Sequence, residues 1–278
     1  MKRWVGVVCA AALPSWGEAA GFECLIEASQ VVEIRSTVDG MIANVHVQRG
    51  DNVRKGQALV DLSSTVERLA VESARYRSVM EGQISSARNR VDYATKKLAR
   101  ATDLQQQNYA SAQTRDEAEA ERRLAESELQ AAIENRELAK IEHRRAVEQL
   151  GLRTMASPFN GVVVDRMLNP GDLAESGSGR KPVLKVAQID PLRVDIVLPA
   201  SLFGQVKPGM KAFVAPQGGK LRYTASVKLI DWLVDAASST FVARLELANP
   251  KFEIPGGVRC SAEIDGISAP ALAVRPKL

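Results

Sequence analysis

The chain has 278 residues, enough for two or three small domains, and only 5% of them are aromatic, which argues against one large core. Its formal net charge is +4 at pH 7, and positive residues alternate with negative ones along the charged regions. Without a separate Lys/Arg block, nucleic-acid binding is not expected.

The N-terminus has the pattern of an export signal. Lys2 and Arg3 precede an apolar run, and small residues then lead to a cleavage point after Ala19 or Ala20. The apolar run is too short to span a bilayer comfortably. Residues 1–20 are therefore predicted to be a cleaved signal peptide, and a buried N-terminal helix is the alternative. The mature chain is expected to be exported and soluble, or only peripherally attached to a membrane.

Export leaves Cys24 and Cys260 in the mature protein. In an oxidising compartment two cysteines can pair, but the sequence does not show that they are close, so two buried free thiols remain the alternative. The only histidines, His46 and His143, have no cysteine or carboxylate at ligand spacing. No metal site and no cofactor is expected.

Two segments of the chain repeat each other at a constant offset of 121 residues, "STVDGMIANVHVQRGDNVRKGQAL" and "SPFNGVVVDRMLNPGDL". The matching turn residues are Gly40, Gly50, Asp51 and Gly56 in the first copy and Gly161, Gly171, Asp172 and Gly177 in the second. Each Gly-Asp pair is predicted to form a turn, because glycine accepts the positive φ that such turns need. Asp51 and Asp172 are therefore interpreted as turn residues and not as an acid–base pair.

Each copy predicts two short strands, 41–47 and 58–62 in the first copy and 162–168 and 183–187 in the second. One copy cannot bury its apolar face alone. Residues 36–63 and 155–189 are therefore expected to close into one split β-sandwich with pseudo-twofold symmetry.

Between the copies, residues 64–154 are predicted to be helical, because good helix formers dominate and proline is absent from 15 to 157. Apolar residues recur at a spacing of three or four in two series, Ile84, Ala87, Val91, Ala94, Leu98, Ala101 and Ala125, Leu129, Ala132, Ala139, Ala146, Leu150. This heptad pattern is typical of a coiled coil. The series lose phase at "QQQNYASAQ", which favours an antiparallel hairpin of two helices of about 40 residues, each about 60 Å long. One uninterrupted helix is the competing interpretation.

A second apolar stripe on the second helix is formed by Leu124, Ala131 and Leu138, with Ile141 close by. One hairpin arm cannot cover both stripes, so neighbouring hairpins are expected to pack together.

Residues 190–265 alternate apolar and polar residues between proline and glycine breaks. The pattern predicts about six short antiparallel strands, with a short helix near Pro199–Val206. Residues 21–35 are expected to form an N-terminal strand that joins this domain, and residues 266–278 form a C-terminal tail. If Cys24 lies in that strand beside the last one, which carries Cys260, a bridge would tie the N-terminus to the domain.

These motifs together resemble the periplasmic adaptor (membrane fusion protein) family of tripartite efflux pumps and type I secretion systems. "ASPFNGVV" is similar to the family's "APFDGVV" signature, and "VQRGDNVRKGQAL" to its first half-motif. The resemblance implies a mostly β fold with a long inserted α-helical coiled-coil hairpin, a split biotinyl-lipoyl-like β-sandwich and a small antiparallel β-barrel. Carrier proteins of the biotinyl-lipoyl type hold a modifiable lysine between the halves, whereas this chain reads "VDLSSTVER" there, without lysine.

The resemblance also implies a function. It identifies a non-enzymatic periplasmic adaptor, peripheral to the inner membrane, that bridges an inner-membrane transporter of the RND, ABC or another class to a TolC-like outer-membrane channel. It implies a hexamer in the assembled pump. Arg100, Leu104 and Ser111 match an R-x₃-L-x₆-S pattern that docks the hairpin tip of similar adaptors on the channel.

The chain departs from the family pattern after the barrel. Pump-type members continue after the barrel into a membrane-proximal domain, whereas this sequence ends at Leu278, so the way in which a transporter is gripped is not carried over. A self-associating coiled-coil scaffold without a channel partner is the alternative function. A biotinyl or lipoyl carrier is disfavoured by the missing lysine, and neither a G-x-S-x-G nor a phosphate-loop motif is present.

Overall fold

The computed structural model describes residues 21–268 except 178 and 220. The predicted signal peptide and most of the predicted C-terminal tail lie outside the described residues. The chain divides into two compact units. Of the described residues, one unit holds 33–159 and 163–186, and the other holds 21–32, 160–162 and 187–268.

The first unit contains most of both repeats, whose strands are β2 (Gly40–Val45), β3 (Asn52–Val53), β4 (Ala58–Leu62), β5 (Thr154–Ala156), β6 (Gly161–Arg166) and β7 (Leu173–Ala174). A four-stranded sheet has the order β5-β4-β2-β7. Its central strands come from the first repeat and its outer strands from the second, and β3 of the first repeat pairs with β6 of the second. The two repeats therefore share their sheets instead of forming one sheet each.

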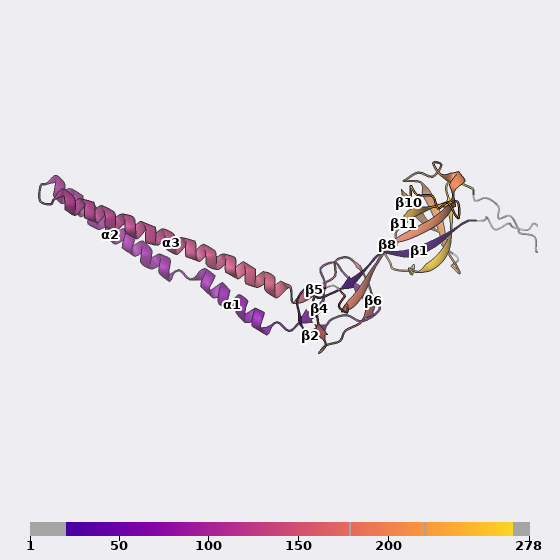
Figure 1. The fold of residues 1–278 in the computed structure, drawn as a ribbon, viewed down its shortest axis with the longest axis horizontal. Coiled ribbons are helices and arrows are strands. Elements are labelled where there is room, and N and C mark those ends of the chain that lie inside the picture. The colour runs from indigo at the N-terminus through magenta and orange to yellow at the C-terminus, as the bar shows by residue number, and fades with distance from the viewer. Residues whose placement is uncertain (1–20, 178, 220, 269–278) are drawn as a thin grey trace, which may run out of the picture. The chain divides into compact units, whose positions relative to one another are not determined.

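The inserted tract forms an antiparallel helical hairpin from α1 (Thr65–Val79), α2 (Gly82–Gln106) and α3 (Ala112–Gly151). Both α1 and α2 pack against α3 (Figure 1). The chain reverses between Gln106 and Ala112, inside the stretch where the heptad series lose phase. One uninterrupted helix is therefore wrong.

The first arm is not the single helix of about 40 residues that the sequence predicts. It is interrupted at Met80, whose backbone is extended (φ −66°, ψ 126°), and resumes at Gly82. Two local features favour this break. The Ser78 hydroxyl donates to the Arg75 carbonyl at 2.7 Å, in competition with the helical ladder, and glycine is among the weakest helix formers.

The contact between the arms follows the predicted seam. Ile84, Ala87, Ala94 and Ala101 of α2 are buried, as is Ala125 of α3, and the other residues of the two series are half-buried. Ala118 is also buried and extends the seam by one heptad toward the hairpin tip.

Ion pairs cross between the arms on both sides of this seam. They are Lys97–Glu121 at 2.6 Å, Arg90–Glu128 at 2.7 Å, Arg136–Glu81 at 3.1 Å and Arg77–Glu142 at 3.8 Å. Exposed pairs of this kind contribute about 0–1 kcal/mol each. They therefore fix the register of the arms more than their stability.

The second unit is a closed barrel built from β1 (Phe22–Ile34), β8 (Leu184–Pro199), β9 (Lys211–Pro216), β10 (Tyr223–Ile230), β11 (Thr240–Leu247) and β12 (Val258–Ile264). Their order is β1-β12-β9-β10-β11-β8, and a β1–β8 pairing closes the ring. Alternate side chains point inward and form the core, among them Phe241, Ile196 and Ala262. The predicted helix near Pro199–Val206 is only one 3₁₀ turn, η1 (Ala200–Leu202).

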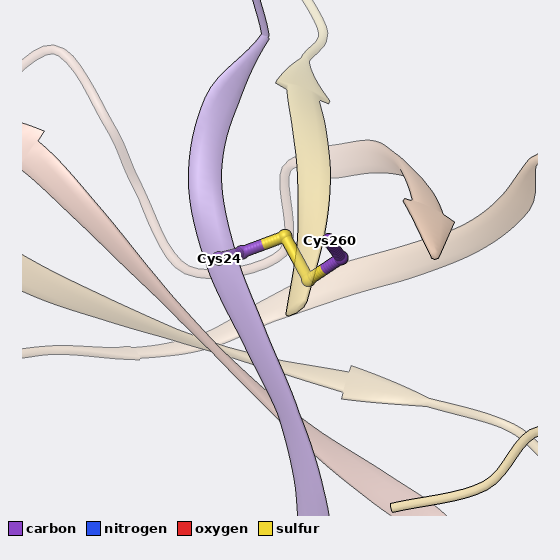
Figure 2. Close-up of a disulfide and its surroundings, with 2 residues drawn as sticks. All are labelled: Cys24 and Cys260. Carbon is purple, nitrogen blue, oxygen red and sulfur yellow. A yellow bond between two sulfur atoms is a disulfide. The ribbon is translucent and has the colours of Figure 1, made fainter. Parts of the chain in front are cut away.

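The described cysteines lie opposite each other on neighbouring barrel strands. Cys24 of β1 is the register partner of Cys260 of β12, their Cα atoms are 4.8 Å apart, and a disulfide joins them (Figure 2). Of the two alternatives that the sequence leaves open, the structure has the bridge.

Candidate functional site at the hairpin tip

The end of α2 is closed by a left-handed cap. Asn108 has a φ of +61°, and its N–H donates to the Gln105 carbonyl at 2.9 Å. The Tyr109 N–H donates to the Leu104 carbonyl at 2.8 Å. These two bonds are those of a Schellman motif with asparagine in the place that glycine usually takes. The tip is thus a defined turn whose last helical carbonyls are satisfied.

The start of α3 is closed by Ser111. Its Oγ accepts from the Thr114 N–H at 3.2 Å and lies 3.0 Å from the Thr114 hydroxyl. Serine is among the preferred N-cap residues because it satisfies one of the free N–H groups of the first turn. Ser111 therefore has a local structural role at the start of α3.

The tip exposes one cationic side chain and two large apolar ones. Arg100 is exposed, and no described carboxylate lies within 4.0 Å of its guanidinium. Leu104, one turn further along α2, is 46% exposed, and Tyr109 in the turn is 79% exposed. A cation beside two apolar side chains on a capped turn can bind another protein surface, because the donors and the apolar area are already in place.

The Gly-Asp turns of the two repeats bond to each other's strands. The Gly50 N–H donates to the Val163 carbonyl, and the Gly171 N–H donates to the Ile42 carbonyl, both at 2.9 Å. In return, the Val163 and Ile42 N–H groups donate to the carbonyls of Asp51 and Asp172, also at 2.9 Å. Each bond has a counterpart 121 residues away, so reciprocal backbone hydrogen bonds join the two repeats.

The two aspartates close their own turns with their side chains. Asp51 Oδ2 accepts from the Gln48 N–H at 2.7 Å, and Asp172 Oδ2 accepts from the Asn169 N–H at 2.8 Å. Matching glycines provide the positive φ that was expected, +94° at Gly50 and +93° at Gly171. Carboxylates that accept local backbone bonds in exposed turns are structural groups.

Gly40 leaves room for the Arg153 side chain at the hairpin root. A Cβ at this position would lie 2.7 Å from Arg153 Nη1. Arg153 donates from that nitrogen to the Asp39 carbonyl at 2.9 Å, and from Nη2 to Glu67 Oε1 at 2.6 Å. Because Glu67 lies in α1 and Asp39 precedes β2, this arginine ties the hairpin to the sheet. Gly161, the matching residue of the second repeat, is buried at the start of β6.

His46 has a partner that the sequence did not predict. Its Nε2 lies 2.7 Å from Asp61 Oδ2, and the Thr154 hydroxyl donates to Asp61 Oδ1 at 2.8 Å. Partial burial raises the pKa of Asp61, but the hydrogen bonds from His46 and Thr154 outweigh it and leave that pKa below its usual value. The cluster connects the residue after β2 with β4 and β5, and its His and Asp side chains are substantially exposed.

Neither a metal centre nor a spanning helix is found in the part of the chain that the structure describes. No group of three or more His, Cys, Asp or Glu side chains could hold a metal ion there. None of the described helices combines the length and the apolar character needed to cross a membrane.

A family model described as a CzcB-like barrel-sandwich hybrid domain matches residues 30–187, more than half of the chain. The chain belongs to the CzcB-like barrel-sandwich hybrid family. The match covers both repeats and the hairpin inserted between them.

The curated relatives of this chain include a membrane fusion protein and a multidrug export protein. The chain is 24% identical over 207 residues to the pyoverdine export membrane fusion protein PvdR of Pseudomonas putida, covering 74% of this chain and 53% of that protein. It is 22% identical over 261 residues to the multidrug export protein AcrE of Escherichia coli, covering 89% of this chain and 64% of that protein. The chain thus spans about half the length of the first of these relatives. The predicted resemblance to the membrane fusion protein family is confirmed.

Solved structures of membrane fusion proteins share the fold. MacA from Actinobacillus actinomycetemcomitans superimposes with a TM-score of 0.72 at 22% identity, over 88% of this chain and 77% of that one. The membrane fusion protein Spr0693 from Streptococcus pneumoniae R6 gives 0.60 at 18% identity, over 88% of this chain and 98% of that one.

Proposed function

We propose that the protein is a non-enzymatic periplasmic adaptor that links an inner-membrane transporter to a TolC-like outer-membrane channel through the hairpin tip. The observation that carries this proposal is the tip itself. On a membrane fusion protein fold, a turn capped at both ends presents Arg100 and Leu104 to solvent. Removal of the signal peptide would release the mature chain into the periplasm, where it can reach both partners.

The tip acts by desolvation in this proposal. In the free protein an exposed charge such as Arg100 contributes little to stability. In a docked state the Arg100 guanidinium becomes buried against the channel. A buried polar group that is then left without a hydrogen-bond partner costs about 1–3 kcal/mol of binding free energy. Ser111 holds the first turn of α3, so it positions the tip as well as offering a small contact surface.

The hairpins are proposed to assemble side by side as coiled coils in a hexameric ring. Leu124, Leu138 and Ile141 of α3 are exposed in the single chain, and α1 exposes its own apolar residues Val66, Leu69 and Tyr76. Apolar patches on two helices of one hairpin mark surfaces for further contacts. Six tips in one ring would then bind the channel together, and this multivalency would raise the overall affinity above that of a single tip.

The test separates docking from folding. Arg100→Asp and Leu104→Asp should abolish export while helical circular dichroism and thermal unfolding stay nearly unchanged, because both side chains are exposed. Ala94→Asp should instead melt the hairpin, since Ala94 is buried in the seam. Arg88→Asp, which makes the same charge change at an exposed residue of α2 away from the tip, is the matched control. Full export by both tip variants would refute the docking role and favour a scaffold without a channel partner.

A further inference from the structure

The face that α1 turns toward α3 is out of step with the seam face of α2. The buried and half-buried seam residues of α2 are Ile84, Ala87, Val91, Ala94, Leu98 and Ala101, and those of α1 are Glu67, Val71, Ala74 and Ser78. Continuing the spacing of α2 backward gives instead Val66, Ala70, Ser73, Arg77 and Met80. Four of these precede the observed residues by one. The inward face of α1 is therefore turned by one residue, or about 100°.

The interruption between α1 and α2 makes this offset possible. Met80 and Glu81 separate the two helices, which both lie along α3 (Figure 1). Ion pairs show that the height of the first arm along α3 does not change at the interruption. The residue numbers of Arg90–Glu128 add up to 218, and those of Arg77–Glu142 add up to 219. Relative to a continuation of α2, α1 thus differs mainly by rotation about its own axis.

The rotation leaves large apolar side chains outside the hairpin. Val66, Leu69, Tyr76 and Met80 are between 54% and 75% exposed. Val66 and Met80 belong to the continued series, and Leu69 and Tyr76 lie beside it on the same side of the helix. The seam of α3 opposite α1 is only half-buried, at Ala139, His143, Ala146 and Leu150. Two surfaces that match in their heptad phase are therefore both incompletely covered.

One ion pair at the hairpin root holds α1 in its observed rotation. Glu67 Oε1 accepts from Arg153 Nη2 at 2.6 Å, and both side chains are only about one-fifth exposed. Arg153 is fixed to the sheet, because its Nη1 donates to the Asp39 carbonyl at 2.9 Å and its carbonyl accepts from the Leu62 N–H at 2.8 Å. Turning α1 back by one residue would place Val66 where Glu67 now lies. The Glu67–Arg153 pair is thus a latch on the rotation.

We propose that α1 is a two-position segment that turns about its own axis when the latch between Glu67 and Arg153 opens. In the turned position α1 and α2 form one continuous helix, and the four apolar side chains move into the seam or to its margin. Arg77 stays near Glu142, because the height along α3 does not change. The first N–H groups of α2 gain the intrahelical acceptors that a helix start lacks. Opening the latch therefore hides an apolar face that the latched position offers to other proteins.

The test uses the purified mature chain and the variant Glu67→Gln, which removes the charge of the latch and keeps the side-chain shape. The turned position should become the major one, because a charged hydrogen bond is lost. We expect hydroxyl-radical oxidation of Tyr76 and Met80 to fall at least about twofold, and amide exchange of residues 82–84 to slow by a similar factor. Glu72→Gln, the same change at an exposed residue of α1, should alter neither.

A second variant favours the turned position without touching the latch. Gly82 begins α2 in the latched position and becomes an interior residue of the continuous helix. A Cβ at this residue would meet open space. Because alanine is favoured over glycine in a helix interior by about fivefold, Gly82→Ala should also slow the exchange of residues 83 and 84. In the double variant with Glu67→Gln, the slowing should exceed that of either change alone.

Three results would overturn the two-position segment. The first is unaltered exchange of residues 83 and 84 in both Glu67→Gln and Gly82→Ala. The second is faster exchange throughout α1 in Glu67→Gln with undiminished oxidation of Tyr76, which means that the helix frays. The third is a fall in oxidation that grows with protein concentration, because a second copy of the chain then covers the face. The inference concerns the single chain, so each of these results leaves the adaptor function untouched.

Discussion

The disulfide between Cys24 and Cys260 should be the largest single covalent contribution to barrel stability, and Cys24→Ala with Cys260→Ala removes it. The bridged residues are 236 positions apart. In the chain-entropy model a loop of that length restricts the unfolded chain by about 18 cal/mol/K, or about 5.5 kcal/mol at 25 °C. Residual structure in the unfolded chain reduces this value, so we expect a loss of about 2–4 kcal/mol.

Hydrogen exchange measures this loss strand by strand. Protection of β1 and β12 in the double variant should fall by a factor of about 30 to 1,000, the equivalent of 2–4 kcal/mol. Peptides from α3 should keep their protection, because the hairpin belongs to the other unit. A reductant should reproduce the effect in the wild type and leave the double variant unchanged. Unaltered protection of β1 and β12, or two free thiols per chain in the native oxidised protein, would refute the reasoning.

Three further changes test individual contacts. Ser111→Ala should lower the exchange protection of the first turn of α3 by an amount equivalent to about 1 kcal/mol, and Ser111→Asp should retain it because aspartate also caps helices; equal protection in all three proteins would contradict the cap. Arg153→Ala removes the largely buried pair with Glu67 and should destabilise the first unit by about 1–3 kcal/mol in denaturant unfolding, whereas the exposed control Arg77→Ala should change it by less than about 1 kcal/mol. Because the pKa of Asp61 is lowered in the folded state, its stabilisation is present above the unfolded-state pKa and lost as the pH falls through the folded value; the wild type should therefore lose stability faster than Asp61→Asn between about pH 5 and pH 2, and parallel curves would contradict this.

The repeats and the hairpin could be predicted because their signals are local in the sequence. The two Gly-Asp turns, 121 residues apart, require a positive φ at their glycines, and both Gly50 and Gly171 have it. The helical seam follows the heptad pattern, so the buried residues of α2 and α3 other than Ala118 belong to the predicted series. Ala118 was missed because the polar tip residues around it obscure the period.

The remaining features do not follow from the repeat pattern or the heptad pattern. The interruption at Met80 follows from a competing side-chain bond of Ser78 and from Gly82, and neither residue breaks a helix by itself. The pairing of His46 with Asp61 needs the register of β2 against β4, which the repeat pattern does not specify. Trp232 follows β10, and only the structure shows that its side chain is exposed.

The central claim is that the hairpin tip docks on an outer-membrane channel. The most direct measurement is photo-crosslinking from position 104 of the full chain in intact cells, followed by identification of the adduct. The account predicts an adduct with an outer-membrane channel protein that disappears when Arg100→Asp is introduced and persists with Arg88→Asp. A folded, exported protein that gives no outer-membrane adduct from this position would contradict the account.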